Sequence, residues 1–355
     1  MVTIYGKKIS KEELLRRVGD ISQIARIIRF EMLDGNQKGV EVAQVHSGSG
    51  LIFDILLGRG MDIGMATYNG IPLNWYSGTG YVESSYFEPE DFGWLRSFHG
   101  GLLTTCGLTY LGKPCVDNGK KLGLHGRISN IPAKNICLNT YWEKDDYILS
   151  VKGEAREISV FGENVCLRRE ITVRTGEPRL FIHDEIENMG YSEVEHMILY
   201  HFNLGYPIVD EGSKLISKTK ELIPRDKEAE LSKEDYNRFT APIKNFKEKV
   251  YYHKMESDKN GFVTTALVNE QFCNGQGIVV YLKYSIKELP FFVEWKMVGE
   301  GVYVVGLEPG NCLVEGRDKE REAKRLKYLM PGEIKKYNLE LGVINSKKEI
   351  IGLVK

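Results

Sequence analysis

Several features that mark other classes of protein are missing from this sequence. No apolar run is long enough to span a bilayer, and residues 1–10 lack the apolar core of a secretory signal. The 355-residue chain has a net charge of −1, with no basic stripe and no acidic tail. These absences argue against membrane and nucleic-acid partners, and we expect a cytoplasmic protein.

Cysteine is scarce and scattered. The six cysteines never form a C-x-x-C pair; they are Cys106, Cys115, Cys137, Cys166, Cys273 and Cys312. In a chain of this length without a signal peptide, such spacing is typical of reduced core thiols. Histidines are also present, but no H-x-H or H-E-x-x-H spacing supports a metal site. We therefore predict no metal site.

Most of the remaining sequence has the pattern of short strands and turns. Two hairpins are predicted, the first from strands 180–186 and 194–204. The second joins strands 291–298 and 302–307 through a three-residue loop, Gly299-Glu300-Gly301. There is no linker, no low-complexity tract and no short repeat. We therefore expect an all-β fold, a single large antiparallel sandwich.

Two segments depart from the strand pattern. Ser10 followed by Glu13 fits a capping box, so one helix is predicted within an N-terminal extension, residues 1–25. A more charged stretch, residues 217–249, predicts a short and partly helical insertion at a sheet edge. We expect residues 1–355 to form one domain that carries both segments.

The predicted strand 194–204 ends with two polar side chains on one face. Side chains alternate between the faces of a strand, so Tyr200 and Phe202 share an apolar face, whereas His201 and Asn203 share the other. A polar pair at the mouth of a sheet suits ligand binding. The alternative is a hydrogen-bonded structural histidine.

A glutamate follows the apolar row of another predicted strand. Val302, Val304 and Glu308 share a face, and such surroundings raise the pKa of a carboxyl above its free value of about 4.3. A glutamate tuned in this way can accept a proton near neutral pH; the alternative is a strand-end residue in a turn. The predicted three-residue loop would place Lys296 on the same face as Glu308.

Three further segments offer groups for binding. His99 stands beside two glycines, and His125 and Arg127 would alternate onto one face of an extended segment. Arg59 could bind a hydroxyl or carboxylate of a ligand, but a pairing with Asp62 that fixes a tight turn is an equally good interpretation.

Five segments together resemble a known family, the aldose 1-epimerases, and in particular a bacterial branch of the galactose-mutarotase-like proteins. The resemblance covers most of the chain, from about residue 58 to 343. The segments are Arg59-Gly60-Met61-Asp62-Ile63-Gly64, Leu124-His125-Gly126-Arg127, His201-Phe202-Asn203-Leu204, Gly306-Leu307-Glu308-Pro309 and Pro331-Gly332-Glu333.

The resemblance implies a β-supersandwich that interconverts the α and β anomers of a free aldose without a cofactor. By motif, Glu308 resembles the base, His201 the acid and His125 a second histidine near the ring oxygen. The familiar mutarotases place the histidine four residues before the asparagine, a position that Leu199 occupies here, whereas His201 stands two before Asn203. A carboxylate nearby would raise the pKa of the histidine.

The predicted site therefore has two catalytic and six binding residues. The catalytic residues are His201 and Glu308, and the substrate-binding residues are Arg59, His99, His125, Arg127, Asn203 and Lys296. The predicted partner is a small-molecule sugar of unassigned identity, and a homodimer is left open. The alternatives are a non-catalytic carbohydrate-binding β-sandwich and a glycosidase accessory domain; glycosidases need paired carboxylates, and only one persuasive carboxylate is found.

Overall fold

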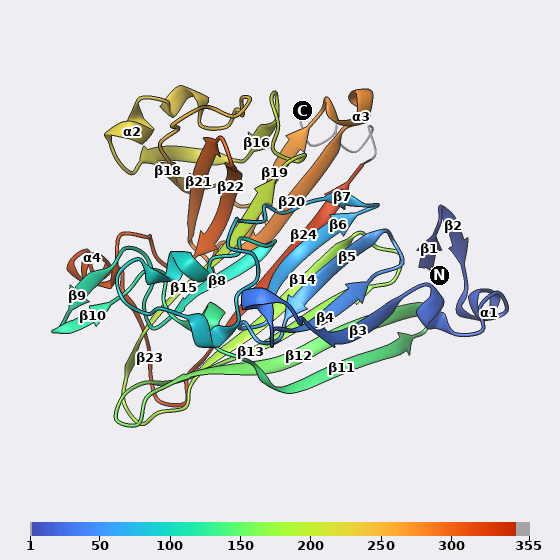
Figure 1. The fold of residues 1–355 in the computed structure, drawn as a ribbon, viewed down its shortest axis with the longest axis horizontal. Coiled ribbons are helices and arrows are strands. Elements are labelled where there is room, and N and C mark those ends of the chain that lie inside the picture. Colours follow the sequence, from blue (N-terminus) through green and yellow to red (C-terminus); the bar gives the residue numbers. More distant parts are fainter. Residues whose placement is uncertain (1, 346–355) are drawn as a thin grey trace.

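The computed structural model describes residues 2–345 of the chain. These residues form two large antiparallel sheets of twelve and eight strands and two separate two-stranded hairpins. The ribbon in Figure 1 shows the long strands of both sheets running across the molecule, with short helices only at its periphery. The predicted all-β antiparallel sandwich is confirmed.

The twelve-stranded sheet carries most of the segments singled out in the sequence. Its main path is β17 (Thr219–Pro224), β18 (Lys249–Met255), β21 (Phe291–Gly299), β22 (Val302–Gly310), β15 (Val194–Gly205), β8 (Leu103–Leu108), β6 (Asp62–Tyr68), β5 (Leu51–Leu56), β4 (Glu41–His46) and β3 (Arg26–Glu31). Two short strands lie off this path, since β23 (Lys327–Leu329) pairs with β15 and β7 (Ile71–Pro72) pairs with β6.

The eight-stranded sheet covers one face of the larger sheet. Its order is β11 (Lys134–Glu143), β12 (Asp146–Ile158), β13 (Asn164–Arg174), β14 (Arg179–Asn188), β24 (Ile334–Ile344), β20 (Ile278–Ser285), β19 (Phe262–Asn269) and β16 (Lys214–Ile216). The hairpins are β1 (Val2–Ile4) with β2 (Lys7–Ile9) and β9 (Cys115–Asp117) with β10 (Lys120–Leu122).

The helices are all short. They are α1 (Lys11–Leu15), α2 (Lys227–Glu230), α3 (Phe272–Gly275) and α4 (Arg317–Glu322), with 3₁₀ turns η1 (Ile21–Gln23), η2 (Gly35–Gln37), η3 (Ser84–Tyr86), η4 (Gly93–Ser97), η5 (Ile128–Asn130) and η6 (Lys233–Asp235). Among residues 2–345, no helix is long and apolar enough to cross a membrane.

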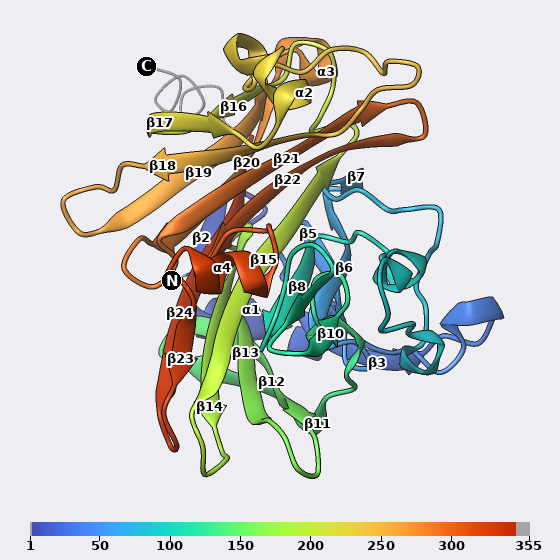
Figure 2. The ribbon, with the colours of Figure 1, turned by 90° about the vertical axis from the view of Figure 1, so that its left-hand side faces the viewer.

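Strand β15 is buried on both faces, which distinguishes it from the half-exposed strands at the sheet edges. On one face Ile198, Tyr200 and Phe202 pack into the main core between the two sheets. On the other face Met197 and Leu199 join a second apolar cluster. The predicted alternation along this strand is therefore confirmed, and Figure 2 shows β15 running between β22 and β8.

Only one of the two predicted hairpins forms. Strands β21 and β22 pair directly, as predicted. The segments predicted as the first hairpin are both strands, but β14 pairs with β13 and β24, whereas β15 pairs with β8 and β22. The chain between β14 and β15 thus crosses from one sheet to the other, because each strand buries its apolar face from the opposite side of the core.

The two predicted non-strand segments are partly helical. The Ser10 capping box is present, with its hydroxyl accepting from the Glu13 amide, but helix α1 ends at Leu15, and the hairpin β1–β2 precedes it. The charged insertion begins as the edge strand β17 and continues through α2 and η6. Figure 1 shows α2 beside β18, at the opposite end of the molecule from α1.

Candidate active site

His201 and Glu308 face each other across two neighbouring strands. The register of β15 and β22 pairs Leu199 with Gly310 and Phe202 with Leu307, which puts His201 opposite Glu308. The Nε2 atom of His201 lies 3.1 Å from Oε1 of Glu308. Gly306 makes this approach feasible, because a Cβ at that position would lie 2.3 Å from the same Oε1.

Both groups are almost completely withdrawn from water. The side chains of His201 and Glu308 are only 6% and 3% exposed. Burial is the largest influence on each: it raises the pKa of Glu308 well above 4.5 and lowers the pKa of His201 from 6.5 to about 3. The pKa of His201 thus lies below its ordinary value, contrary to the expectation that a nearby carboxylate raises it. The two opposite shifts favour the neutral pair, in which Glu308 holds the proton.

Both residues line a cavity of about 360 Å³ with aromatic walls. Its aromatic lining includes Trp94, Phe98 and Trp295, and the rings of Phe98 and Trp295 each lie 5.5 Å from the His201 ring. Trp94 and Phe98 come from η4 and the residue that follows it, whereas Trp295 comes from β21. Aromatic faces of this kind pack against the C–H faces of sugar rings.

His125 reaches the same cavity from a loop. Its ring lies 6.1 Å from that of His201 and 4.8 Å from that of Trp94. The backbone of His125 has a φ of +56°, in the left-handed region that costs a side chain about 1 kcal/mol or more. Burial lowers the pKa of His125 to about 4, so it is neutral near pH 7.

An ion pair also lines the cavity. The Arg225 guanidinium donates to Glu248 at 2.9 Å, and the indole N–H of Trp295 donates to the other oxygen of the same carboxylate at 3.0 Å. Lys113 is also part of the wall and pairs with Glu315 at 2.7 Å. Sequence reasoning missed Arg225 and Glu248, because nothing in the charged insertion distinguishes them from its other ionic residues.

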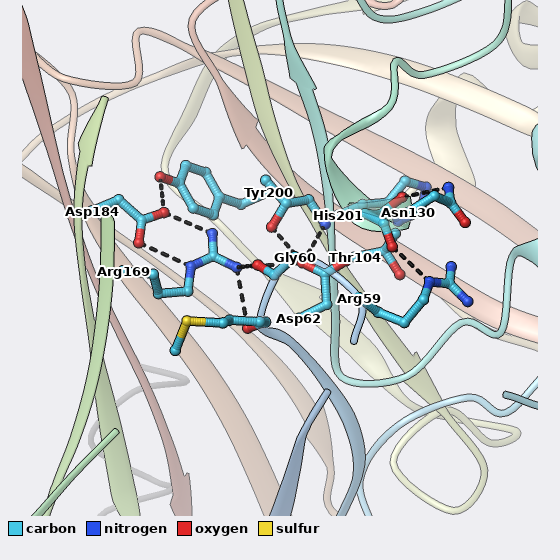
Figure 3. Close-up of polar contacts among 12 residues, drawn as sticks. Arg59, Gly60, Asp62, Thr104, Asn130, Arg169, Asp184, Tyr200 and His201 are labelled. Atoms are coloured by element: carbon cyan, nitrogen blue, oxygen red, sulfur yellow. Dashed lines mark hydrogen bonds and ion pairs between the residues drawn. The ribbon is translucent and has the colours of Figure 1, made fainter. Parts of the chain in front are cut away.

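Arg59 lies outside the cavity. It is fully buried, and its guanidinium donates to three backbone carbonyls, those of Ser129, Val82 and Ser97, at 2.6, 2.5 and 2.9 Å. Its guanidinium N–H groups thus connect three loops through hydrogen bonds. This arrangement does not support the predicted binding role. Asp62 pairs instead with Arg169, which Figure 3 shows between Asp62 and Asp184.

Lys296 points to the opposite side of the sheet from Glu308, so the predicted shared face is wrong. In the β21–β22 hairpin Gly299 pairs with Val302, which leaves a two-residue loop, and Glu308 is opposite Val293. Shortening the predicted loop by one residue shifts the register and turns every side chain of one strand to the other face. Lys296 instead donates to the carbonyls of three insertion residues, Asp235, Tyr236 and Arg238.

The other predicted binding residues, His99, Arg127 and Asn203, are not among the residues that line the cavity. His99 is fully buried, and neither of its ring nitrogens has a hydrogen-bond partner within residues 2–345. Arg127 is exposed and lies over the Phe87 ring. The predicted extended segment does not form, because His125 and Gly126 both have positive φ. Asn203 is fully buried next to His201.

A second and larger cavity, of about 580 Å³, lies on the other side of β18 and β21. It contains Lys249 and Lys296, whose ammonium groups are bonded to the walls of the insertion. The smaller cavity is the better candidate site, because it alone of the two holds an opposed acid and base.

Comparisons with known proteins agree with this architecture. The family described as a domain of unknown function (DUF4432) matches residues 37–343. The structure resembles a candidate aldose 1-epimerase from Klebsiella pneumoniae, with a TM-score of 0.88, 23% identity and coverage of 97% of this chain and 89% of that one. No curated protein sequence gives a significant match.

Two more distant structures share the same fold. A galactose mutarotase-like protein from Clostridium acetobutylicum aligns with a TM-score of 0.65 at 12% identity, covering 91% of this chain and 99% of that one. A galactose 1-epimerase from Lactobacillus acidophilus aligns with a TM-score of 0.57 at 12% identity over the same shares. The predicted galactose-mutarotase-like sandwich is confirmed as the fold.

Proposed function

The chain belongs to the DUF4432 family, and from the site that its fold builds we propose that it is an aldose 1-epimerase acting on a free sugar. The observation that carries the proposal is the buried pair of His201 and Glu308, 3.1 Å apart in the lining of an aromatic cavity. Binding a sugar does not require an opposed carboxyl and histidine, both buried. Moving protons at an anomeric centre requires an acid and a base placed together in this way.

The pair contains the one proton that the reaction has to move. In ring opening, one member takes the proton of the anomeric hydroxyl while the other gives its proton to the ring oxygen. The bond between C1 and the ring oxygen breaks, and the electrons of the O1–H bond form the aldehyde carbonyl. Rotation about C1–C2 and reversal of these steps close the ring on the other face and restore the proton to the pair.

We assign Glu308 as the base and His201 as the acid, so the resting proton must pass from Glu308 to His201 when the sugar binds. The 3.1 Å separation allows this transfer directly. A hydroxyl donating to Glu308 stabilises the carboxylate and so lowers its pKa. His125 is the rival proton donor, because its ring opens onto the same cavity.

The remaining groups of the cavity suit a monosaccharide. The aromatic walls offer stacking surface, and Glu248, which accepts from Arg225 and the Trp295 indole, lines the cavity and offers acceptors for hydroxyl groups. Glu248 is thus our candidate for the hydroxyl-binding carboxylate that the sequence motifs left unassigned.

The test is anomer exchange across a panel of free aldoses and acidic sugars, followed by polarimetry or saturation-transfer NMR. Wild-type protein should accelerate exchange of at least one sugar above the buffer rate, and Glu308→Gln should not. If the wild-type protein binds a sugar without accelerating its exchange, the alternative of a non-catalytic carbohydrate-binding protein replaces this proposal.

A further inference from the structure

The two ring nitrogens of His201 have different surroundings. Nε2 faces the Glu308 carboxyl and the cavity. Nδ1 is buried on the other side of the ring and has no hydrogen-bond partner within residues 2–345. A histidine that exchanges protons through one nitrogen normally has its tautomer set by a partner on the other, so the open Nδ1 calls for an acceptor.

Asn203 carries an acceptor on the same face of the strand as His201. It lies two residues along β15 on the same face as His201. Its amide nitrogen donates to the backbone carbonyls of Gly100 at 3.3 Å and of His201 at 2.9 Å. Since only the NH₂ end can donate to carbonyls, the orientation of the amide is fixed by these two bonds.

The fixed orientation leaves the amide oxygen free to accept. Oδ1 of Asn203 is buried and is likewise without a partner in the described part of the chain. Two unpartnered buried atoms of complementary kind therefore lie on one face of one strand. The Asn203 side chain also acts to raise the pKa of His201, against the larger effect of burial, which is the action of an acceptor beside the ring.

We propose that Asn203 is a positioning residue: its Oδ1 accepts a hydrogen bond from Nδ1–H of His201 and holds the ring in the tautomer whose Nε2 can take up a proton. In the other tautomer Nε2 would already bear a hydrogen and could not receive the proton from Glu308. The catalytic consequence rests on the proposed epimerase function, whereas the tautomer itself does not.

The tautomer can be measured directly by ¹⁵N NMR of protein labelled at histidine. The His201 signals are assigned by their loss in His201→Asn. Near neutral pH, wild type should show a protonated Nδ1 and an unprotonated Nε2, whether or not the sugar is known. If His201 instead shows a protonated Nε2 and a bare Nδ1, the proposal is overturned, independently of any activity measurement.

Three variants then test whether Asn203 sets the tautomer of His201 or only stabilises strand β15. Asn203→Ala removes the acceptor and both donors, so the Nε2–H tautomer should become populated. Asn203→Asp keeps an oxygen acceptor but loses the donors, so the Nδ1–H tautomer should persist. Asn311→Ala is the matched control, because Asn311 also braces β15, through the Ile198 amide and the His196 carbonyl, without approaching His201.

Kinetics on the sugar that the panel identifies complete the test. Asn203→Ala should lower kcat by about tenfold to a hundredfold, the range typical of residues that orient a functional histidine, with KM changed less than about threefold. Asn311→Ala should leave both near wild type. If the two alanine variants lose activity equally while the His201 tautomer stays unchanged, Asn203 only braces the strand. If Asn203→Ala does not fold, the tautomer of His201 in the ¹⁵N spectra of wild type and Asn203→Asp still tests the proposal.

Discussion

Replacing Glu308 with glutamine should abolish anomer exchange and at the same time stabilise the fold at neutral and alkaline pH. No hydrogen bond from residues 2–345 reaches Oε1 of Glu308, and burial raises the pKa of this carboxyl well above 4.5. A buried carboxyl without donors is costly when it is ionised. Glutamine keeps the shape of the side chain and does not ionise.

The sign of the stability effect follows from proton linkage. The unfolded chain releases the Glu308 proton near pH 4.5, whereas the folded protein holds it to a higher pH. The stability that this group contributes is therefore fully present below pH 4.5 and is lost as the pH rises toward the folded pKa. Each unit between the two pKa values corresponds to about 1.4 kcal/mol. The glutamine variant escapes this loss, so its advantage over wild type should grow between pH 4.5 and pH 8.

Urea denaturation at pH 5 and pH 8 measures the difference in the free energy of unfolding between Glu308→Gln and wild type. In a thermal melt of a chain of this size, each kcal/mol corresponds to a shift of about 1 °C in melting temperature. Exchange should fall by about 10²- to 10⁴-fold, the usual effect of losing a general base. Glu157→Gln is the matched control for exchange, which it should leave near the wild-type rate: Glu157 is equally buried in a strand, but it accepts from the Leu108 amide and the Thr109 hydroxyl outside the cavity. Near-normal turnover in Glu308→Gln, or a stability difference that is the same at both pH values, would refute the reasoning.

The remaining predictions concern the other groups of the site. Because burial raises the pKa of Glu308 well above 4.5 and lowers that of His201 to about 3, the one-proton pair should exist between about pH 3 and the raised pKa of Glu308; an acidic limb at pH 4.5 in the pH–rate profile would contradict this. His201→Asn should mainly lower kcat and His125→Asn mainly raise KM, and the opposite result would exchange their roles. Lys296→Met should destabilise the fold by about 2–4 kcal/mol in urea without altering KM, because it removes bonds to three carbonyls outside the cavity; a raised KM would place it in the site. Prolonged chelator treatment should leave activity unchanged, and restoration of lost activity by zinc would overturn this expectation.

Strand periodicity predicted the central part of the site correctly, because it depends only on local geometry. Alternation alone puts His201 on the opposite face of β15 from Tyr200, and the structure agrees. That Glu308 lies opposite His201 required the pairing of β15 with β22, about a hundred residues apart in the chain. Here the family motifs supplied what periodicity could not.

Register was the point at which local reasoning failed. The sequence of the glycine-rich loop after β21 is compatible with a loop of either two or three residues. The prediction of three residues was wrong, and it placed Lys296 on the face of Glu308. With the correct loop, Trp295 would have been placed on the face of Glu308, where it lines the cavity. Arg59 illustrates a different difficulty: a buried arginine can be saturated by backbone carbonyls, which have no sequence signature.

The fold fixes the strand beneath the buried ionisable pair from the other face of the sheet. The hydroxyl of Tyr200, the residue before His201, donates to Asp184 at 2.7 Å, and Asp184 accepts two bonds from Arg169 (Figure 3). Arg169 also contacts Asp62, which accepts from the Thr105 amide of the neighbouring strand β8. This buried network ties β15 and β8 to the opposite sheet. Because the network fixes β15 on the face opposite His201, the backbone that carries this ring keeps its position beside Glu308. Under the proposed function, the pair then responds to a bound sugar by proton transfer between its two groups.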